Sequence, residues 1–198
     1  MRAAKVAVLG VVVVAAALGI SRRVNLRHLG HIDEAFAAMG IVHANQAGRA
    51  SPHESVSETI DGSLITITYG RPYMRGRTIF GRLVPYGRVW CPGADEATTF
   101  DSARDAQMGN LKVPAGPHTI WILPTAATWT LFVSREPSGF HTNYNASANL
   151  GSLDMQKRSI ETPVEQLTFA IAKNPNGPGG IVKMTWETTE VSVPFTVQ

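Results

Sequence analysis

Five arginines lie within eighteen residues of this sequence, and no acidic residue falls between them. They are Arg71, Arg75, Arg77, Arg82 and Arg88. A guanidinium group presents a planar fork of N–H donors that matches a carboxylate or a phosphate, so this cluster could hold an anionic ligand or phospholipid headgroups. Alternatively, several of these side chains pair with nearby acidic residues or cap turns between strands. Our candidate ligand contacts among them are Arg71, Arg77 and Arg88.

A second group of residues could carry acid–base chemistry. Asp95 and Glu96 are adjacent, and with His118 they would supply the carboxylates and the imidazole that general acid–base catalysis uses. However, adjacent residues of a strand point to opposite faces, so only one of the two carboxylates could face a given site. His118 stands at the start of a predicted strand, where a hydrogen-bonded or solvated role is the usual one. We therefore include Asp95 and Glu96 among the ligand-binding candidates and predict no catalytic residue.

The sequence carries no metal or cofactor motif that we can identify. Its one cysteine, Cys91, cannot form an internal disulfide and would be a poor metal site by itself. His28 and His31 could share a ligand on a predicted helix, although two exposed polar residues near a membrane are the simpler interpretation. Phosphate-loop, dinucleotide and nucleophile-elbow patterns are absent from the sequence. We predict no cofactor and no metal.

Four tryptophans could form a platform on which a sugar stacks, or they could lie in the core. They are Trp90, Trp121, Trp129 and Trp186. In a β-domain, large aromatic side chains are more often buried, and we favour the core for these four.

The positive charge of the chain is concentrated near its N-terminus. Residues 1–50 hold six basic and two acidic residues, whereas residues 51–198 hold twelve basic and thirteen acidic ones. Basic residues around an apolar run set membrane topology and contact lipid headgroups. The net charge of +3 therefore gives no reason to expect nucleic-acid binding, and we predict none.

Residues 6–20 form a run of fifteen residues without a charge. The run is either a signal peptide that is cleaved or an anchor that stays in the membrane. Fifteen helical residues span about 22 Å, which is short of the ~30 Å hydrocarbon core, but flanking basic side chains can snorkel to the interface. Arg22 and Arg23 directly after the run are unusual for a cleaved signal. We therefore favour a signal-anchor or transmembrane helix over residues 1–23.

The next segment, residues 24–54, is predicted to be a short amphipathic helix followed by a polar linker. Its apolar residues recur at spacings of three and four. They are Leu29, Ile32, Phe36 and Met39. Such a helix would pack on its own domain, on the membrane surface or against a partner subunit. Together with Arg22 and Arg23, these residues are the candidate membrane or partner contacts.

The remainder of the chain has the pattern of short strands. In residues 64–69, Ile65, Ile67 and Tyr69 fall on one face of a β-branched segment. Similar segments lie at 119–123, 129–133, 167–171, 181–188 and 191–197. The last two predict a hairpin around Thr189 and Glu190.

Two wider features of this part of the chain complete the fold prediction. Residues 135–163 have a weak pattern and predict a long loop. No segment after residue 60 has helical periodicity over a helix's length. The fold class is therefore all-β, an antiparallel β-sandwich or barrel-like domain over residues 55–198.

Several short motifs in this domain resemble those of a known family. They are Tyr69-Gly70-Arg71-Pro72, Gly76-Arg77-Thr78-Ile79-Phe80-Gly81, Leu83-Val84-Pro85-Tyr86-Gly87-Arg88-Val89-Trp90, Gly93-Ala94-Asp95-Glu96-Ala97-Thr98-Thr99, Val113-Pro114-Ala115-Gly116 and Trp186-Glu187. The resemblance is to the DUF2911 family, bacterial and usually exported proteins of unknown function, and it covers roughly residues 55–198. The family commonly has arginine and asparagine where this chain has Cys91 and Asp95.

These observations predict a non-enzymatic accessory or structural subunit on the periplasmic, extracytoplasmic side of a membrane. Its N-terminal helix would lie in the lipid bilayer, and the subunit would bind an integral membrane protein complex, respiratory or photosynthetic. Two alternatives remain open. The first is an exported hydrolase-like enzyme that uses Asp95, Glu96 and an arginine. The second is a module that binds a small ligand or a glycan through the arginine-rich segment.

Overall fold

The computed structural model describes residues 50–198 of the chain. The predicted transmembrane helix and most of the 24–54 segment, including all six candidate membrane or partner contacts, lie outside the described residues. Within 50–198, one helical element is present, the 3-10 turn η2 (Ala146–Ala148), and no helix is long and apolar enough to span a membrane.

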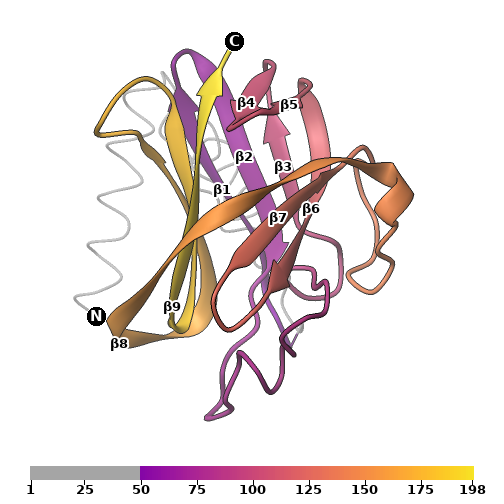
Figure 1. Ribbon diagram of the computed structural model, residues 1–198, viewed down its shortest axis with the longest axis vertical. Coiled ribbons are helices and arrows are strands. Elements are labelled where there is room, and N and C mark those ends of the chain that lie inside the picture. The colour runs from indigo at the N-terminus through magenta and orange to yellow at the C-terminus, as the bar shows by residue number, and fades with distance from the viewer. Residues whose placement is uncertain (1–49) are drawn as a thin grey trace, which may run out of the picture.

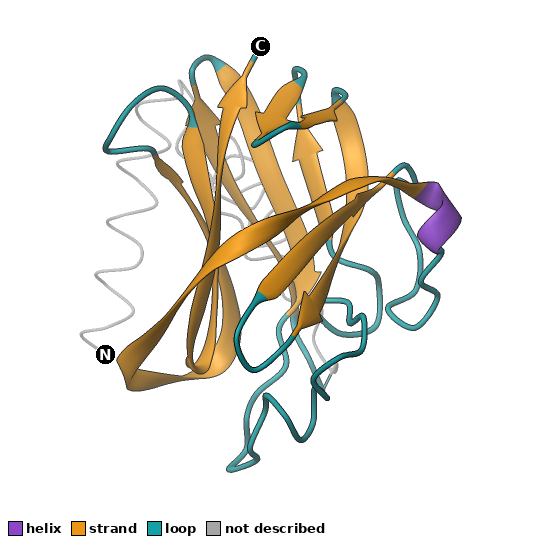
Figure 2. Ribbon diagram, in the orientation of Figure 1, coloured by secondary structure: helices purple, strands orange, loops and turns teal. Residues whose placement is uncertain are grey.

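The described residues form a single nine-stranded sheet in which every pair of neighbours is antiparallel (Figures 1 and 2). The strands are β1 (His53–Ile60), β2 (Ser63–Gly70), β3 (Thr99–Ser102), β4 (Ala106–Met108), β5 (Leu111–Val113), β6 (Gly116–Pro124), β7 (Trp129–Ser134), β8 (Asn149–Lys173) and β9 (Gly180–Val197). Their order across the sheet is β1-β2-β3-β6-β7-β8-β9-β4-β5. The prediction of an all-β, antiparallel domain is confirmed. β1 begins at His53, ahead of the boundary expected at residue 55.

The long strand β8 bends the sheet around its core. Its first residues pair with β7, and the strand then continues along β9 with register shifts between Ser159 and Val164 and between Val164 and Thr168. Figure 1 shows β8 running obliquely across the molecule. β8 also contacts β1, which is an edge strand of the sheet, so segments far apart in the strand order lie side by side.

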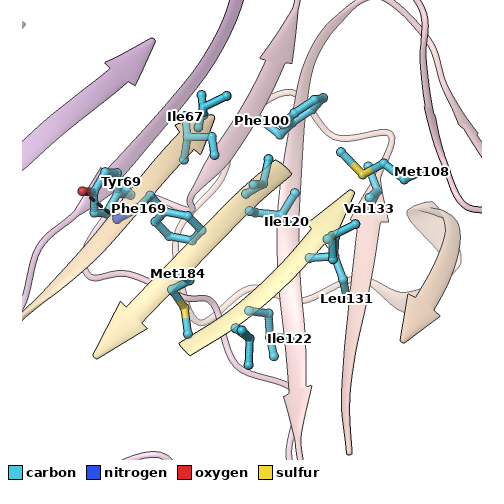
Figure 3. Close-up of a cluster of buried hydrophobic side chains, with 14 of the residues drawn as sticks. Ile67, Tyr69, Phe100, Met108, Ile120, Ile122, Leu131, Val133, Phe169 and Met184 are labelled. Carbon is cyan, nitrogen blue, oxygen red and sulfur yellow. Dashed lines mark hydrogen bonds between the residues drawn. The ribbon is translucent and has the colours of Figure 1, made fainter. Parts of the chain in front are cut away.

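Alternation of apolar and polar residues places one face of each strand in this core. Ile65, Ile67 and Tyr69 of β2 are buried as predicted, while Leu64 beside them is 54% exposed. Figure 3 shows Ile67 in the same cluster as Met184 of β9. The large apolar side chains that fill this space remove apolar surface from water, which is the main stabilising contribution to a fold of this kind. Of the four tryptophans, Trp129 and Trp186 are buried in this core, and Trp121 is buried in a separate, smaller cluster. The fourth, Trp90, is only partly buried.

Two predictions about the C-terminal half are wrong. The expected hairpin at Thr189 and Glu190 is absent, because β9 continues unbroken from Gly180 to Val197. Glu190 pairs in register with Arg158 of β8, whose guanidinium donates two hydrogen bonds to the Glu190 carboxylate. This pair holds Glu190 in an extended strand where the sequence predicted a turn. The expected loop 135–163 ends at Asn149, where β8 begins.

Candidate functional site

A long loop, residues 71–98, connects β2 to β3 and extends beyond the ends of the strands (Figure 1). Backbone hydrogen bonds attach it to neighbouring strands: Met74 N–H donates to the Glu165 carbonyl at 2.7 Å, and Trp90 exchanges two bonds of 2.8 Å with Ile122. Its reversals place Gly81 and Gly87 at φ of 85° and 77°, which glycine adopts without strain. The backbone of this loop is therefore held in a defined conformation against the sheet.

Arg71, the first residue of this loop, connects three strands. Its Nε donates to the Leu167 carbonyl at 3.0 Å, Nη2 donates to Thr168 Oγ1 at 2.9 Å, and Nη1 donates to Glu54 Oε2 at 2.6 Å. The Arg71 and Glu54 side chains are only 18% and 15% exposed. This arginine, a candidate ligand contact from the sequence, thus joins β1 and β8 to the end of β2.

The two residues before Arg71 complete this connection. The buried Tyr69 hydroxyl accepts a hydrogen bond from the Phe169 N–H at 3.0 Å, and burial raises the pKa of the phenol, which keeps it neutral. At Gly70, a Cβ atom would lie 2.2 Å from the Ala94 carbonyl oxygen, so only glycine fits. The Tyr69-Gly70-Arg71 motif is therefore explained by the packing of the loop on the sheet.

A pocket of about 400 Å³ opens between this loop and the start of the described chain. Its chemically distinctive lining residues are Tyr73, Arg75, Arg77, Trp90, His141 and Trp186. The Trp90 ring lies nearly parallel to the buried Trp186 ring, at an interplanar angle of 18° and a centroid distance of 6.2 Å. The pocket thus combines an aromatic wall with two cationic side chains.

The two arginines of the pocket are held by backbone carbonyls. Arg77 donates from Nε to Met74 at 2.9 Å and from Nη2 to Tyr73 at 2.6 Å, which confirms the turn-capping interpretation for this residue. Arg75 donates to the Ala50 carbonyl at 3.3 Å and lies 5.9 Å from the centre of the Tyr73 ring. Within residues 50–198, neither guanidinium forms an ion pair with a carboxylate.

His141 reaches the pocket from another loop, between β7 and β8. Its backbone N–H and its Nδ1 lie 2.9 Å and 2.7 Å from the Asp95 carbonyl oxygen. Because a carbonyl oxygen only accepts hydrogen bonds, Nδ1 must carry a proton, and Nε2 is the acceptor in the neutral ring. Sequence analysis missed His141, since no motif marks a residue that a distant loop brings to the site.

The structure does not assemble Asp95, Glu96 and His118 as an acid–base set. Both His118 ring nitrogens are at hydrogen-bonding distance from backbone carbonyls, Ser134 at 2.8 Å and Pro114 at 3.0 Å. Glu96 lies 3.5 Å from His53 Nδ1 at the start of β1. Asp95 contributes its backbone carbonyl to His141 and takes a left-handed conformation with φ of 64°.

Cys91 is fully buried beside Trp121 and Ala97, and its Sγ accepts a hydrogen bond from the Thr98 N–H at 3.3 Å. Burial raises the pKa of this thiol to about 11, so it stays protonated and unreactive at neutral pH. In the part of the chain that the structure describes, no group of three or more histidine, cysteine or acidic residues could hold a metal ion.

The outer part of the loop exposes both apolar and basic side chains. Leu83 and Tyr86 are 45% and 43% exposed, which is high for large hydrophobic residues. Arg82 and Arg88 are exposed on the same segment. We call these four residues the loop face. Arg88, a candidate ligand contact from the sequence, is not among the residues that line the pocket.

Residues 51–195 match the family model described as "Protein of unknown function (DUF2911)". The chain belongs to the DUF2911 family. The DUF2911 resemblance in the sequence is therefore confirmed, and most of its motifs fall on the 71–98 loop and on the strands that hold it. No curated protein and no solved structure matches the chain.

Proposed function

We propose that this chain is a non-enzymatic accessory subunit, tethered to a membrane through its N-terminal segment on the extracytoplasmic side. In this proposal the loop face docks on an integral membrane protein complex, for which respiratory and photosynthetic complexes are the first candidates. The observation that carries the proposal is that the loop face and the entry point of the tether lie at the same end of the domain.

The position of Ala50 supports this arrangement. The Arg71 N–H donates to the Pro52 carbonyl at 2.7 Å, and Arg75 donates to the Ala50 carbonyl, so the chain enters the domain against the 71–98 loop. β1 then runs antiparallel to β2 and away from this end, with His53 opposite Gly70. A tether that ends here would hold this end of the domain nearest to the membrane.

The composition of the loop face suits a docking surface. Tyrosine and arginine are enriched at the centres of protein interfaces, and exposed leucine adds apolar area. Arg82 and Arg88 give the loop face two positive charges, so it would complement an acidic patch on a partner. Anionic lipid headgroups at the membrane surface would add to the same attraction.

The state of the reactive side chains favours binding over catalysis. Cys91 is buried and its thiol is protonated, and both ring nitrogens of His118 lie at hydrogen-bonding distance from backbone carbonyls. Asp95 and Glu96 do not meet that histidine in an arrangement typical of general acid–base catalysis. The alternative of an exported hydrolase therefore has less support than a binding role.

Extraction from native membranes tests the proposal. Membranes would be dissolved in a mild detergent and separated by size, and this chain would then be followed by intact mass. We expect a chain that retains its N-terminal segment and migrates in a large complex whose other members can be identified. A chain that has lost about its first twenty residues and migrates as a small soluble species would overturn the proposal.

A further inference from the structure

We infer that the pocket lined by Tyr73, Arg75, Arg77, Trp90 and His141 binds a small carboxylated sugar, of the uronic acid class. This inference goes beyond the proposed function, because the pocket is built from residues of this chain alone. Each of the three chemical features of such a ligand has a counterpart in the lining.

The carboxylate of the ligand corresponds to the two guanidinium groups. Arg77 uses Nε and Nη2 for backbone carbonyls, and Arg75 uses Nη2, so in the described part of the chain the remaining N–H donors of both have no protein acceptor. The two carbonyl contacts of Arg77 position its guanidinium, whereas Arg75 has one contact of 3.3 Å. A guanidinium that is already positioned loses little freedom when it binds an oxyanion, and it binds a planar carboxylate through two parallel hydrogen bonds.

The apolar face of the sugar ring corresponds to the aromatic wall. Trp90 is held by its two backbone bonds to Ile122 and lies against the buried Trp186, so its ring is fixed while part of it remains exposed in the pocket. Tyr73 is held by a backbone bridge to Gln166 of β8. Rigid aromatic rings offer contact area to the C–H face of a pyranose at little cost in conformational entropy.

The hydroxyl groups of the sugar correspond to His141. Its Nδ1 is bound to the Asp95 carbonyl, which leaves Nε2 as an acceptor that no described residue uses. A volume of about 400 Å³ lies within the range of small-molecule sites and accommodates one or two sugar rings. Inorganic phosphate would form contacts with the arginines alone, and a neutral sugar would form contacts with the aromatic wall and His141 alone. The pocket should therefore favour a ligand that has both a negative charge and a sugar ring.

Binding can be measured on the full-length chain in a detergent whose headgroup is not a sugar. Tryptophan fluorescence and ligand-observed NMR would follow titrations with galacturonate, galactose and inorganic phosphate. We expect galacturonate to bind at least tenfold more tightly than galactose, and phosphate to compete only weakly. Equal affinity for galactose and galacturonate, or equal competition by phosphate, would overturn the inference. A trimer of galacturonate shows whether the natural ligand is a polysaccharide or a free sugar. If the trimer binds more tightly than the monomer, the ligand is a polysaccharide, and if the two bind equally, it is a free sugar.

Two matched substitutions locate the site. Arg75→Gln removes an exposed side chain with a single long hydrogen bond, and we expect it to weaken galacturonate binding at least tenfold. Arg104→Gln removes the same charge and a similar hydrogen bond, of 3.4 Å to the Asp61 carbonyl, outside the pocket, and it should leave this affinity unchanged. If the melting midpoint of Arg75→Gln falls, Arg75→Lys replaces it, since lysine keeps the charge but lacks the fork. Unchanged affinity in the folded Arg75 variant contradicts the inference. Because these measurements contain no membrane complex, their failure is distinguishable from failure of the docking proposal.

Discussion

Replacing Arg71 tests whether the first residue of the 71–98 loop stabilises the fold or contacts a ligand. In the structure its guanidinium donates to Leu167, Thr168 and Glu54, and the ion pair with Glu54 is mostly shielded from water. Arg71→Gln keeps a polar side chain but is too short to reach all three acceptors. We expect it to destabilise the domain and to separate the 71–98 loop from β8.

The magnitude follows from the three hydrogen bonds. A hydrogen bond with a charged partner contributes about 1.5–3 kcal/mol, and neutral ones contribute about 1 kcal/mol. Breaking a fully buried ion pair costs about 3–5 kcal/mol, which partial exposure of this pair reduces. We therefore expect a loss of about 3 kcal/mol in the free energy of unfolding. With a urea m-value of about 1.5–2 kcal/mol/M, the midpoint should fall by about 1.5–2 M.

The assay is urea unfolding of the full-length chain in mild detergent, followed by tryptophan fluorescence. Arg88→Gln is the matched control, because this exposed arginine has no hydrogen bond or ion pair within the described residues, and its substitution should change stability by about 0.5 kcal/mol or less. If Arg71→Gln is as stable as Arg88→Gln, then the connection between β1, β2 and β8 does not stabilise the fold as we have argued.

Three further substitutions or treatments address other parts of the fold. Gly70→Ala should cost about 2–3 kcal/mol in urea unfolding, since its methyl group would meet the Ala94 carbonyl, whereas Gly139→Ala has ordinary contacts and should be nearly neutral. Cys91 should resist modification by iodoacetamide at pH 8 and react only in urea, because burial raises the pKa of its thiol to about 11. Intact mass would show the modification, and modification of the native chain would contradict the burial of Cys91. Hydrogen bonds from Arg158 lower the pKa of Glu190, so the stabilisation is present at neutral pH and is lost as pH falls through the folded-state pKa. Glu190→Gln should therefore be less stable than the unsubstituted chain at pH 7, and the difference in thermal midpoint should shrink below about pH 4.3; a difference independent of pH would argue against the pair.

Local sequence patterns predicted the strands whose burial follows simple alternation. β2 is such a strand, because Ile65 and Ile67 face the core, while Leu64 is exposed and Thr66 is only half-buried. The predicted hairpin in β9 failed for a non-local reason. Thr189 and Glu190 predicted a turn, but Arg158, more than thirty residues earlier, pairs with Glu190 and keeps the strand extended.

The candidate site shows the same division between local and distant determinants. Arg77 caps a turn within its own loop, which sequence analysis had considered. Arg71 forms hydrogen bonds with Glu54 and with β8, and His141 lines the pocket from the loop before β8. No local sequence pattern indicates either contact. Composition could therefore identify the arginine-rich segment as a candidate binding segment, whereas the pocket itself depends on contacts between distant segments.

The central claim, that the loop face docks on a membrane protein complex, is tested most directly by photo-crosslinking in native membranes. A photoreactive amino acid would replace Tyr86 on the loop face or, as a control, the exposed Asn176 in the turn between β8 and β9. The account predicts that the probe at position 86 forms a specific crosslink to an integral membrane protein and that the probe at position 176 does not. Crosslinks from position 176 alone, or none to a membrane protein from either position, would contradict it.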